Sequence, residues 1–287
     1  MTGGTASHAE LPGNQLSFGI RLRPREVLAL DREGEVFLSI VIPAYNESRR
    51  LGPSLESIAV YIEQQSFPCE VIVVSDGSTD DTVQIACSFE GRIAGLRIID
   101  RKVNRGKGYS VAEGMRLARG KYVLFTDADL STPIAEAENL LRHLRSGYDI
   151  AIGSRDLPES NVRVPQPWHR RFMGRVFRGL VGLLALRGVK DTQCGFKGFT
   201  REAAEEVFAR VTVDGFGFDI EALYIAEKLG YRIVEVPVTW ADSPESKVNV
   251  LADPLRMFAD LIRIHWRHFR ISALAARRET ALAENHR

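Results

Sequence analysis

The stretch YVLFTDADLSTP, residues 122–133, runs from apolar side chains into two carboxylates, Asp127 and Asp129. Its aromatic, aliphatic and β-branched start predicts a buried strand, and Ser-Thr-Pro predicts a helix start with Thr132 as cap and Pro133 in the first turn. Side chains two apart on a strand point the same way, so we expect both carboxylates to face one cavity. The alternative is that one of them only caps the turn.

Similar apolar runs recur along the first half of the chain and indicate the fold class. They lie at residues 36–43, 70–76, 95–100 and 148–154, with helix-patterned segments between them. This alternation predicts an α/β fold with a mostly parallel central sheet flanked by helices. Ligands of such sheets bind at the carboxyl ends of the strands, and here those ends carry PAYNE, SDGSTDDT and NRGKG as well as DADLSTP. The chain has neither GxGxxG nor GxxxxGK[ST], so dinucleotide and P-loop sites lose their main support.

The overall composition excludes several classes of protein. A formal net charge of +1 argues against a nucleic-acid binder that relies on overall positive charge. Cys69, Cys87 and Cys194 are odd in number and lack CxxC spacing, so we expect neither a disulfide framework nor a zinc site, and a reducing, cytoplasmic compartment. Residues 1–35 lack the pattern of a secretory signal and suit a flexible tail, and no apolar run is long enough to span a bilayer.

Polar residues at the predicted sheet edge suit a phosphate-containing ligand and a metal. Carboxylate pairs such as DAD suit Mg²⁺ or Mn²⁺, which keep water ligands and share substrate phosphates. Asp76 in SDGSTDDT is either a turn residue or an acceptor for the N–H of a nucleobase. Arg105 and Lys107 in NRGKG are either solvated or bind a diphosphate, which Gly106 and Gly108 would allow to approach the backbone.

Two segments of the second half are basic and amphipathic. Residues 163–190 contain basic but no acidic residues, with apolar side chains spaced by three and four between them. A helix from about Pro254 repeats this pattern, with an apolar face of Met257, Phe258, Leu261, Ile262, His265, Trp266 and Phe269. Two such helices would hold a protein on an anionic membrane without crossing it. The alternative for the first is a helix packed on the domain with its arginines in water.

Taken together, these motifs resemble a known enzyme family. LSIVIPAYNE, VIVVSDGSTDDT, NRGKG and DADLSTP are similar to the nucleotide-sugar half of family 2 glycosyltransferases of the GT-A fold. DTQCGFKGFTREAA, FDIEALYIA, VEVPVTW and ESKV resemble the dolichyl-phosphate β-glucosyltransferase and polyprenyl-phosphate sugar synthase branch. The resemblance implies a GT-A domain over residues 36–250, with a nucleotide-sugar half up to about 155 and an acceptor half beyond it. A basic amphipathic helix and tail would follow over residues 251–287.

The resemblance also implies roles for individual residues. The expected donor-binding residues are Pro43, Ala44, Tyr45, Glu47, Asp76, Lys107, Asp127 and Lys247, and the expected metal ligands are Asp127 and Asp129. Two departures from the family pattern stand out: Ser75 replaces a frequent carboxylate, and Ser131 stands where several relatives have Gln.

The expected acceptor is a lipid phosphate, which changes what catalysis requires. A phosphate monoester has its second pKa near 6, so it is largely ionised at neutral pH and needs positioning more than a base. The expected phosphate-binding residues are Arg155, Arg163, Arg170, Arg171 and Gln193, and the expected catalytic residues are Asp219, Lys107 and Asp127. Asp219 and Glu221 lie two apart on a predicted helix and so on different faces, and we favour Asp219. Its alternative role is to place negative charge at the helix N-terminus. Gln193, Cys194 and Lys197 either line the site or form a turn.

The sequence therefore predicts an inverting, Mg²⁺- or Mn²⁺-dependent transfer of glucose from UDP-glucose to a polyprenyl phosphate. The protein would lie on the cytoplasmic face of a membrane, would bind no nucleic acid, and its oligomeric state is left open. The alternatives are GDP-mannose as donor, a soluble acceptor, or a silent nucleotide-binding protein recruited to membranes.

Overall fold

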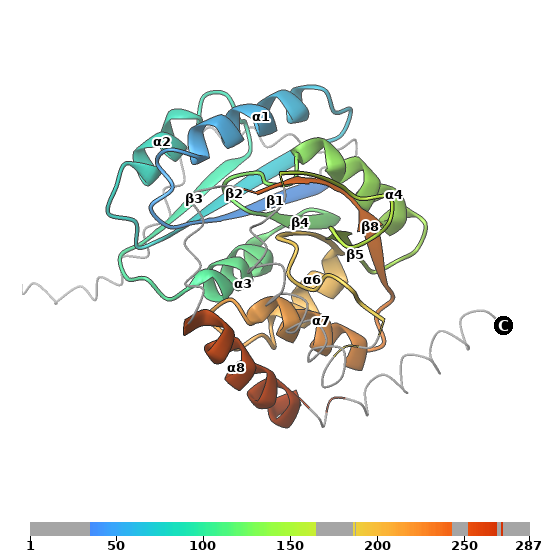
Figure 1. Cartoon of the computed structure of the whole chain (residues 1–287). Helices are drawn as coiled ribbons and strands as arrows, with labels where there is room; N and C mark the ends of the chain where they lie inside the picture. The colour runs from blue at the N-terminus through green and yellow to red at the C-terminus, as the bar shows by residue number, and fades with distance from the viewer. Residues whose placement is uncertain (1–34, 165–185, 187, 243–251, 269–270, 272–287) are drawn as a thin grey trace, which may run out of the picture.

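The computed structural model of the chain describes residues 35–164, 186, 188–242, 252–268 and 271. Its main sheet has seven strands in the order β3-β2-β1-β4-β7-β5-β8 (Figure 1). The strands are β1 (Leu38–Ala44), β2 (Cys69–Asp76), β3 (Leu96–Arg101), β4 (Tyr122–Thr126), β5 (Ile150–Ser154), β7 (Phe196–Thr200) and β8 (Ile233–Pro237). All pairs are parallel except those that β7 makes with β4 and β5. The predicted mostly parallel sheet is confirmed.

Helices cover both faces of this sheet (Figure 1). One face carries α1 (Leu51–Glu63), α2 (Thr82–Ser88), the short η1 (Ile134–Glu136) and α4 (Ala137–Arg145). The other carries α3 (Lys107–Leu117), α6 (Arg201–Phe208), α7 (Phe218–Lys228) and α8 (Ala252–His268). Alternate side chains of β1 enter the two resulting cores: Ile40 and Ile42 pack toward α1, and Val41 packs toward α3. Burial on both faces explains why these strands are continuous apolar runs.

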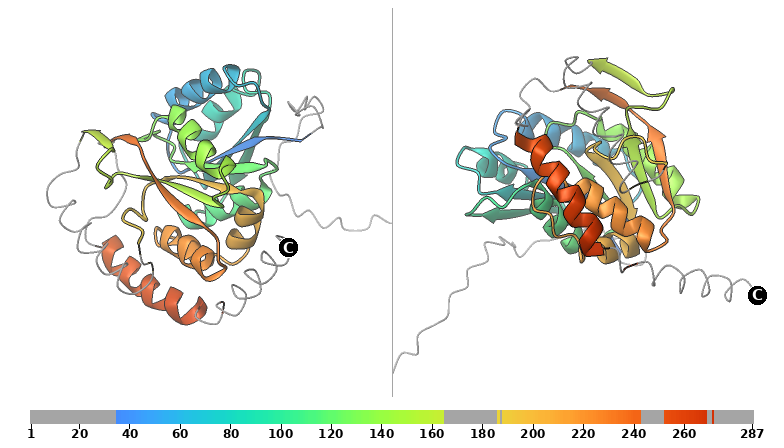
Figure 2. Two further views of the ribbon diagram at one scale, coloured as in Figure 1. Left: turned by 90° about the vertical axis from the view of Figure 1, so that its right-hand side faces the viewer. Right: turned by 60° about the horizontal axis from the view of Figure 1, so that its bottom comes forward.

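A second, two-stranded sheet lies at the margin of the domain. It pairs β6 (Asn161–Val164) with β9 (Thr239–Ala241) in parallel, and Figure 2 shows it set apart from the main sheet. It thus connects the chain after β5 with the chain after β8.

Strand β7 of the main sheet, like β6 of the small sheet, was not predicted from the sequence pattern. Its residues, FKGFT, include a lysine and a glycine in place of an apolar run, yet Phe196–Phe199 are all buried. The strand exists because β4 and β5 pair with it on either side, which is a tertiary effect. Helix α6 follows β7 directly, and the Thr200 hydroxyl caps it by accepting the N–H of Ala203. The predicted Thr132 cap is wrong, because η1 begins after Pro133 and has no side-chain cap.

Helix α8 lies along the outside of α7 (Figure 2). Leu261, Ile264 and His268 are buried against the domain, whereas Ile262 and Trp266 are 46% and 72% exposed. The predicted apolar face is therefore split between the core and the surface, and Met257, Phe258 and Phe269 fall outside the described side chains. Among the described residues, no helix combines the length and apolar character that a membrane crossing requires.

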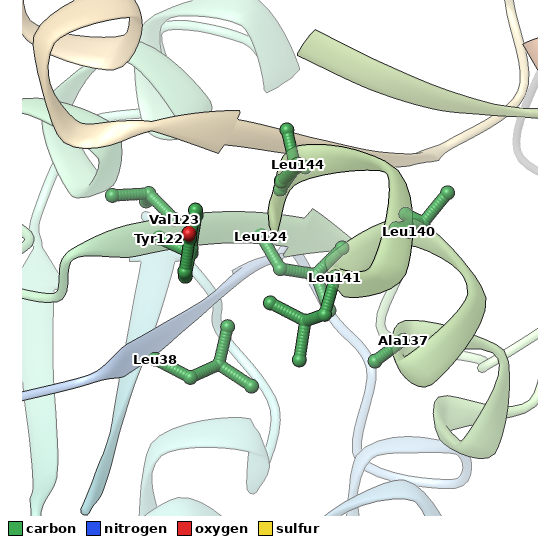
Figure 3. Close-up of a pocket in the computed structure, with 9 residues that line it drawn as sticks. Leu38, Tyr122, Val123, Leu124, Ala137, Leu140, Leu141 and Leu144 are labelled. Carbon is green, nitrogen blue, oxygen red and sulfur yellow. The ribbon is translucent and has the colours of Figure 1, made fainter. Parts of the chain in front are cut away.

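A small cavity between β4 and α4 belongs to the core (Figure 3). Leu38, Leu124, Leu140 and Leu144 line it with five further core residues, and none of them carries a carboxylate, amine or imidazole. We therefore assign no ligand to this cavity. The polar groups of the molecule gather instead at the carboxyl ends of the strands.

Candidate active site

The loops that follow β1 and β2 are hydrogen-bonded to each other at the carboxyl-terminal edge of the sheet. The Asn46 N–H donates to the Ser78 hydroxyl (3.1 Å), and the Asn46 side-chain oxygen accepts the N–H of Thr79 (2.8 Å). The Glu47 N–H donates to the Thr82 hydroxyl (2.7 Å). These bonds bring PAYNE and SDGSTDDT side by side, as their positions after neighbouring parallel strands predict.

Several predicted donor-binding residues lie in these loops. Pro43 and Ala44 are buried at the end of β1, and Tyr45 follows them with 41% of its surface exposed. The Glu47 carboxylate receives two bonds of 2.7 Å from the Arg50 guanidinium. An aromatic ring and a fixed carboxylate therefore stand at the same strand end.

Asp76 organises the NRGKG loop. Its two carboxylate oxygens accept the N–H groups of Arg105 (2.8 Å) and Gly106 (2.7 Å), and it also forms an ion pair with Arg101. The carboxylate predicted to bind a nucleobase is thus already bonded within the protein. Its bonds hold the loop from which α3 starts at Lys107.

The two carboxylates of DAD have different cationic partners. Lys107 Nζ lies 2.6 Å from Asp127 Oδ1, and Arg50 Nη1 lies 3.1 Å from Asp129 Oδ2. Strand β4 ends at Thr126, so both residues lie in the turn after the strand, and strand alternation does not set the direction of their side chains. The turn after β4, in which Leu130 has a φ of 45°, orients them instead.

Strand β7 sets the position of Asp127 from the other side. The Asp127 N–H donates to the Gly195 carbonyl (3.2 Å). A Cβ atom at Gly195 would lie only 2.0 Å from Asp127 Oδ2. The turn before β7 therefore approaches this carboxylate as closely as a residue without a side chain permits.

The residues present fit a divalent cation that is shared with a substrate. Both carboxylates of the pair are partly exposed and already attract cationic side chains. Ser131 donates its N–H and hydroxyl to Asp129 Oδ1, which orients that carboxylate. Within the part of the chain that the structure describes, no group of three or more His, Cys, Asp or Glu side chains is placed to hold a metal. Two carboxylates completed by water and phosphate oxygens are the usual arrangement for Mg²⁺.

Behind Lys107 lies a buried ion pair. Lys197 on β7 forms it with Asp219 in the first turn of α7, and their side chains are 1% and 6% exposed. Burial raises the pKa of Asp219, although Lys197 and Lys107 oppose the rise. Burial would lower the pKa of Lys107, but the charges of Asp127 and Asp219 raise it. Positive and negative side chains thus alternate from the core to the surface of the site, in the order Lys197, Asp219, Lys107 and Asp127.

Glu221 points away from this cluster, in line with its helical spacing from Asp219. It is fully buried and accepts the N–H groups of Thr212 (2.8 Å) and Val213 (2.7 Å). His268 Nε2 of α8 lies 2.7 Å from its other oxygen. Glu221 therefore joins α7 to α8.

The predicted acceptor-binding residues are only partly brought together. Asp191, which the sequence analysis did not name, binds the Arg155 guanidinium at 2.7 and 2.8 Å. Burial would raise the pKa of Asp191, but Arg155 lowers it. Gln193 lies in the same turn, and Arg163 is exposed on β6. Arg170, Arg171 and Lys247 lie outside the described residues.

Sequence reasoning missed two partners at this edge, Arg50 and Asp191. Arg50 follows PAYNE by three residues, and a possible signal was its spacing of three from Glu47, which allows an ion pair on a helix. Asp191 stands 36 residues from Arg155, so no local pattern connects them. Cys194 is buried, which raises its pKa to about 12 and makes a nucleophilic role unsuitable.

Comparison with known proteins places these features in context. The profile of Glycosyl transferase family 2 matches residues 39–208. The dolichyl-phosphate beta-glucosyltransferase of Drosophila melanogaster is 38% identical over 258 residues, which cover 85% of this chain and 79% of that protein. The Homo sapiens protein of the same name is 36% identical over 244 residues, and this alignment covers 80% of this chain and 75% of the human protein.

A solved structure shows the same fold. Glucosyl-3-phosphoglycerate synthase from Mycobacterium tuberculosis, in complex with Mn²⁺, UDP-glucose and phosphoglyceric acid, superposes with a TM-score of 0.61. The two sequences are 21% identical, and the superposed part covers 81% of this chain and 80% of the synthase chain. At this identity the likeness concerns the fold, which is GT-A as predicted.

Proposed function

The chain belongs to glycosyl transferase family 2, and from this premise we propose that it transfers glucose from UDP-glucose to a polyprenyl phosphate. The observation that carries the proposal is the identity of 34–38% with dolichyl-phosphate beta-glucosyltransferases over most of the chain. The product would be a β-linked lipid phosphosugar. The charges at the carboxyl ends of β1, β2 and β4 support this chemistry, because they suit a nucleotide diphosphate and a metal.

The donor would lie across the loops after β1, β2 and β4. Asp127 and Asp129 would hold Mg²⁺ or Mn²⁺, which stabilises negative charge on a departing diphosphate when it is bound. Lys107 stands beside this pair and adds a second positive charge. Pro43, Ala44, Tyr45, Glu47 and Asp76 would hold the base and ribose, and Lys247 would approach the pyrophosphate.

The acceptor needs orientation more than activation. An ionised phosphate oxygen attacks the anomeric carbon, the bond to the diphosphate breaks, and the anomeric centre is inverted. Arg163, Arg170, Arg171 and Gln193 would position the acceptor. Arg155 reaches this region with its guanidinium bonded to Asp191, so its proposed contact with phosphate would add to that ion pair.

The outward face of α8 supports attachment to a membrane surface. Ile262 and Trp266 are exposed one turn apart, and Arg263 and Arg267 are exposed beside them. Each basic residue near an anionic surface contributes about 1 kcal/mol. We propose the cytoplasmic face of a membrane as the location. Sedimentation with anionic vesicles tests this, and a Trp266→Ser variant that binds them as well as the wild type would contradict it.

The decisive experiment offers the protein several donors and acceptors. Purified protein is incubated with Mg²⁺ or Mn²⁺, UDP-glucose or GDP-mannose, and a short polyprenyl phosphate or a soluble phosphorylated acid. We expect a glucolipid only with UDP-glucose, lipid phosphate and metal. Mannose transfer would change the donor, transfer to the soluble acid alone would exclude the lipid acceptor, and no transfer would favour a silent binding protein.

A paired substitution tests the acceptor residues. Replacing Arg170 and Arg171 together by Gln should raise the KM for the lipid phosphate about tenfold or more, with UDP-glucose binding within threefold of wild type. Arg142 and Arg145 on α4 are exposed, and their paired replacement by Gln is the control. Equal losses for donor and acceptor would indicate a structural role.

A further inference from the structure

Strand β7 carries a lysine in the interior of the protein. The side chain of Lys197 is 1% exposed, and its ammonium lies 5.1 Å from the centre of the Phe125 ring. A buried charge has a large desolvation cost unless it is paired and hydrogen-bonded. A lysine retained at such a position therefore requires partners that hold it as a cation.

The partners of Lys197 fix its ammonium in one place. Nζ donates to the Cys194 carbonyl at 2.6 Å and to the Asp219 carboxylate. The carbonyl belongs to the turn before β7, and the carboxylate belongs to the first turn of α7. The lysine thus connects β7 to the start of α7, and one oxygen of Asp219 is committed to it.

Asp219 in turn lies close to the active-site cation, because the starts of α3 and α7 are in contact: a Cβ atom at Gly108, next to Lys107, would lie 2.7 Å from Phe218 Cβ. The charges that act on its carboxylate are those of Lys197, Lys107 and Asp127. Asp127 and Asp219 are the two negative charges that act most strongly on Lys107, and Lys107 forms an ion pair directly with Asp127. A donor diphosphate and its metal would compete for both members of that outer pair. Asp219 is then the negative charge that stays with Lys107.

We propose that Lys197 is a positioning residue that holds Asp219 as a fixed anion behind Lys107. In this arrangement Asp219 orients Lys107 toward the departing diphosphate and does not remove a proton from the acceptor. This inference rests on the proposed function and deepens it, because it assigns Asp219 an electrostatic role. It also explains the burial of the pair, since a charge that orients another is strongest away from water.

A purely structural role predicts a different outcome when both charges are removed. Replacing a buried ion pair by uncharged side chains of similar size often leaves stability unchanged, whereas removing one partner leaves a buried charge uncompensated. Lys197→Met alone should therefore lower the Tm. Lys197→Met combined with Asp219→Asn should recover much of that loss. Activity then separates the two roles, because the double variant keeps the fold and lacks the fixed anion.

The experiment compares these variants in two assays. We expect the double variant to have kcat about 100-fold lower than wild type, with the KM for UDP-glucose within threefold. Calorimetry with Mn²⁺ and UDP, which needs no acceptor, should show UDP binding about tenfold weaker, because free UDP carries the charge of the departing group. Lys121 is an exposed lysine directly before β4, and Lys121→Met is the control, which should match wild type in kcat, KM and UDP binding.

Two results would overturn the inference. If the double variant regains kcat along with its Tm, the pair is structural. If UDP binding is unchanged in the double variant, Asp219 does not act on Lys107. Failure of the wild type to glucosylate a lipid phosphate would instead reject the proposed function, and the UDP assay would still test the role of Lys197.

Discussion

Two ion pairs in the active site differ in their access to solvent. The side chains of Lys107 and Asp127 are 23% and 34% exposed, whereas those of Lys197 and Asp219 are 1% and 6% exposed. Ligands can reach the first pair. Asp127 could therefore leave Lys107 to bind a metal, and Lys107 could leave Asp127 to bind a diphosphate. Ligands cannot reach the second pair without opening the core. In the proposed function, burial thus separates the charges that would bind substrates from those that would position them.

Two further ion pairs differ in the same way, one of them partly exposed and the other formed with a buried carboxylate. Arg50 and Asp129 are each 17% exposed, next to the accessible pair. Asp191, which holds Arg155, is 1% exposed and lies in the segment that leads into β7. We therefore expect substitutions at the accessible pairs to reduce activity and substitutions at the buried pairs to reduce stability as well.

The largest effect should come from breaking a buried pair. Asp191→Asn leaves the Arg155 guanidinium without its counter-charge and should lower the free energy of unfolding by about 3 to 5 kcal/mol. Denaturant unfolding measures this. Asp100→Asn, which affects the surface pair with Lys102, is the control and should change stability by less than about 1 kcal/mol. Equal effects of the two variants would show that burial is not the deciding factor.

Breaking the accessible carboxylate pair should affect activity instead. Asp129→Ala should lower kcat/KM about 10³-fold, equivalent to about 4 kcal/mol, because the metal loses a ligand. Its Tm should stay within about 3 °C of wild type, since the side chain is partly exposed. Asp100→Ala is the control. A variant that keeps full, metal-dependent transfer would remove Asp129 from the metal site.

Gly195 lies between the accessible and the buried groups: its carbonyl accepts the N–H of Asp127, and the carbonyl of the preceding Cys194 accepts from Lys197. In Gly195→Ala the new methyl group would overlap the Asp127 carboxylate and force it to rotate. We expect a 10- to 100-fold lower kcat/KM, about 1.4 to 2.7 kcal/mol, with a smaller loss of stability. Gly91→Ala, where a Cβ meets nothing within 4 Å, should match wild type. Undiminished activity would mean that the position of Asp127 is not critical.

The smallest effect concerns Glu221, which is buried but remote from the substrate. Burial would raise its pKa, but bonds from His268 and Thr212 lower it below the ordinary 4.5. Its contribution to stability is therefore complete above pH 4.5 and is lost as the pH falls through the lowered pKa. Glu221→Gln should lower the free energy of unfolding by about 1 kcal/mol at pH 7, and this difference from wild type should narrow below pH 4.5. A difference that is constant down to pH 3 would contradict the assignment.

The accessible part of the site could be predicted from the sequence, because its motifs stand immediately after apolar runs in the chain. PAYNE, SDGSTDDT and DADLSTP each come where a strand ends, and parallel strands end at one edge. The partners of Asp76 were less predictable, since its bonds to Arg105 and Gly106 cross between loops. Strand β7 could not be predicted, because FKGFT lacks an apolar run and depends on its neighbours.

The α/β class, the carboxylate pair beside a cationic loop, and the basic amphipathic character of the second half could all be inferred from the sequence. These are local properties, set by residue type and spacing over a few positions. Which charges are buried, and which residues they pair with, depends instead on how the strands and helices pack. Lys197 and Asp219 are 22 residues apart, and Arg155 and Asp191 are 36 apart. Such pairs form because β7 inserts antiparallel between β4 and β5, and the resulting burial is a property of the packed molecule.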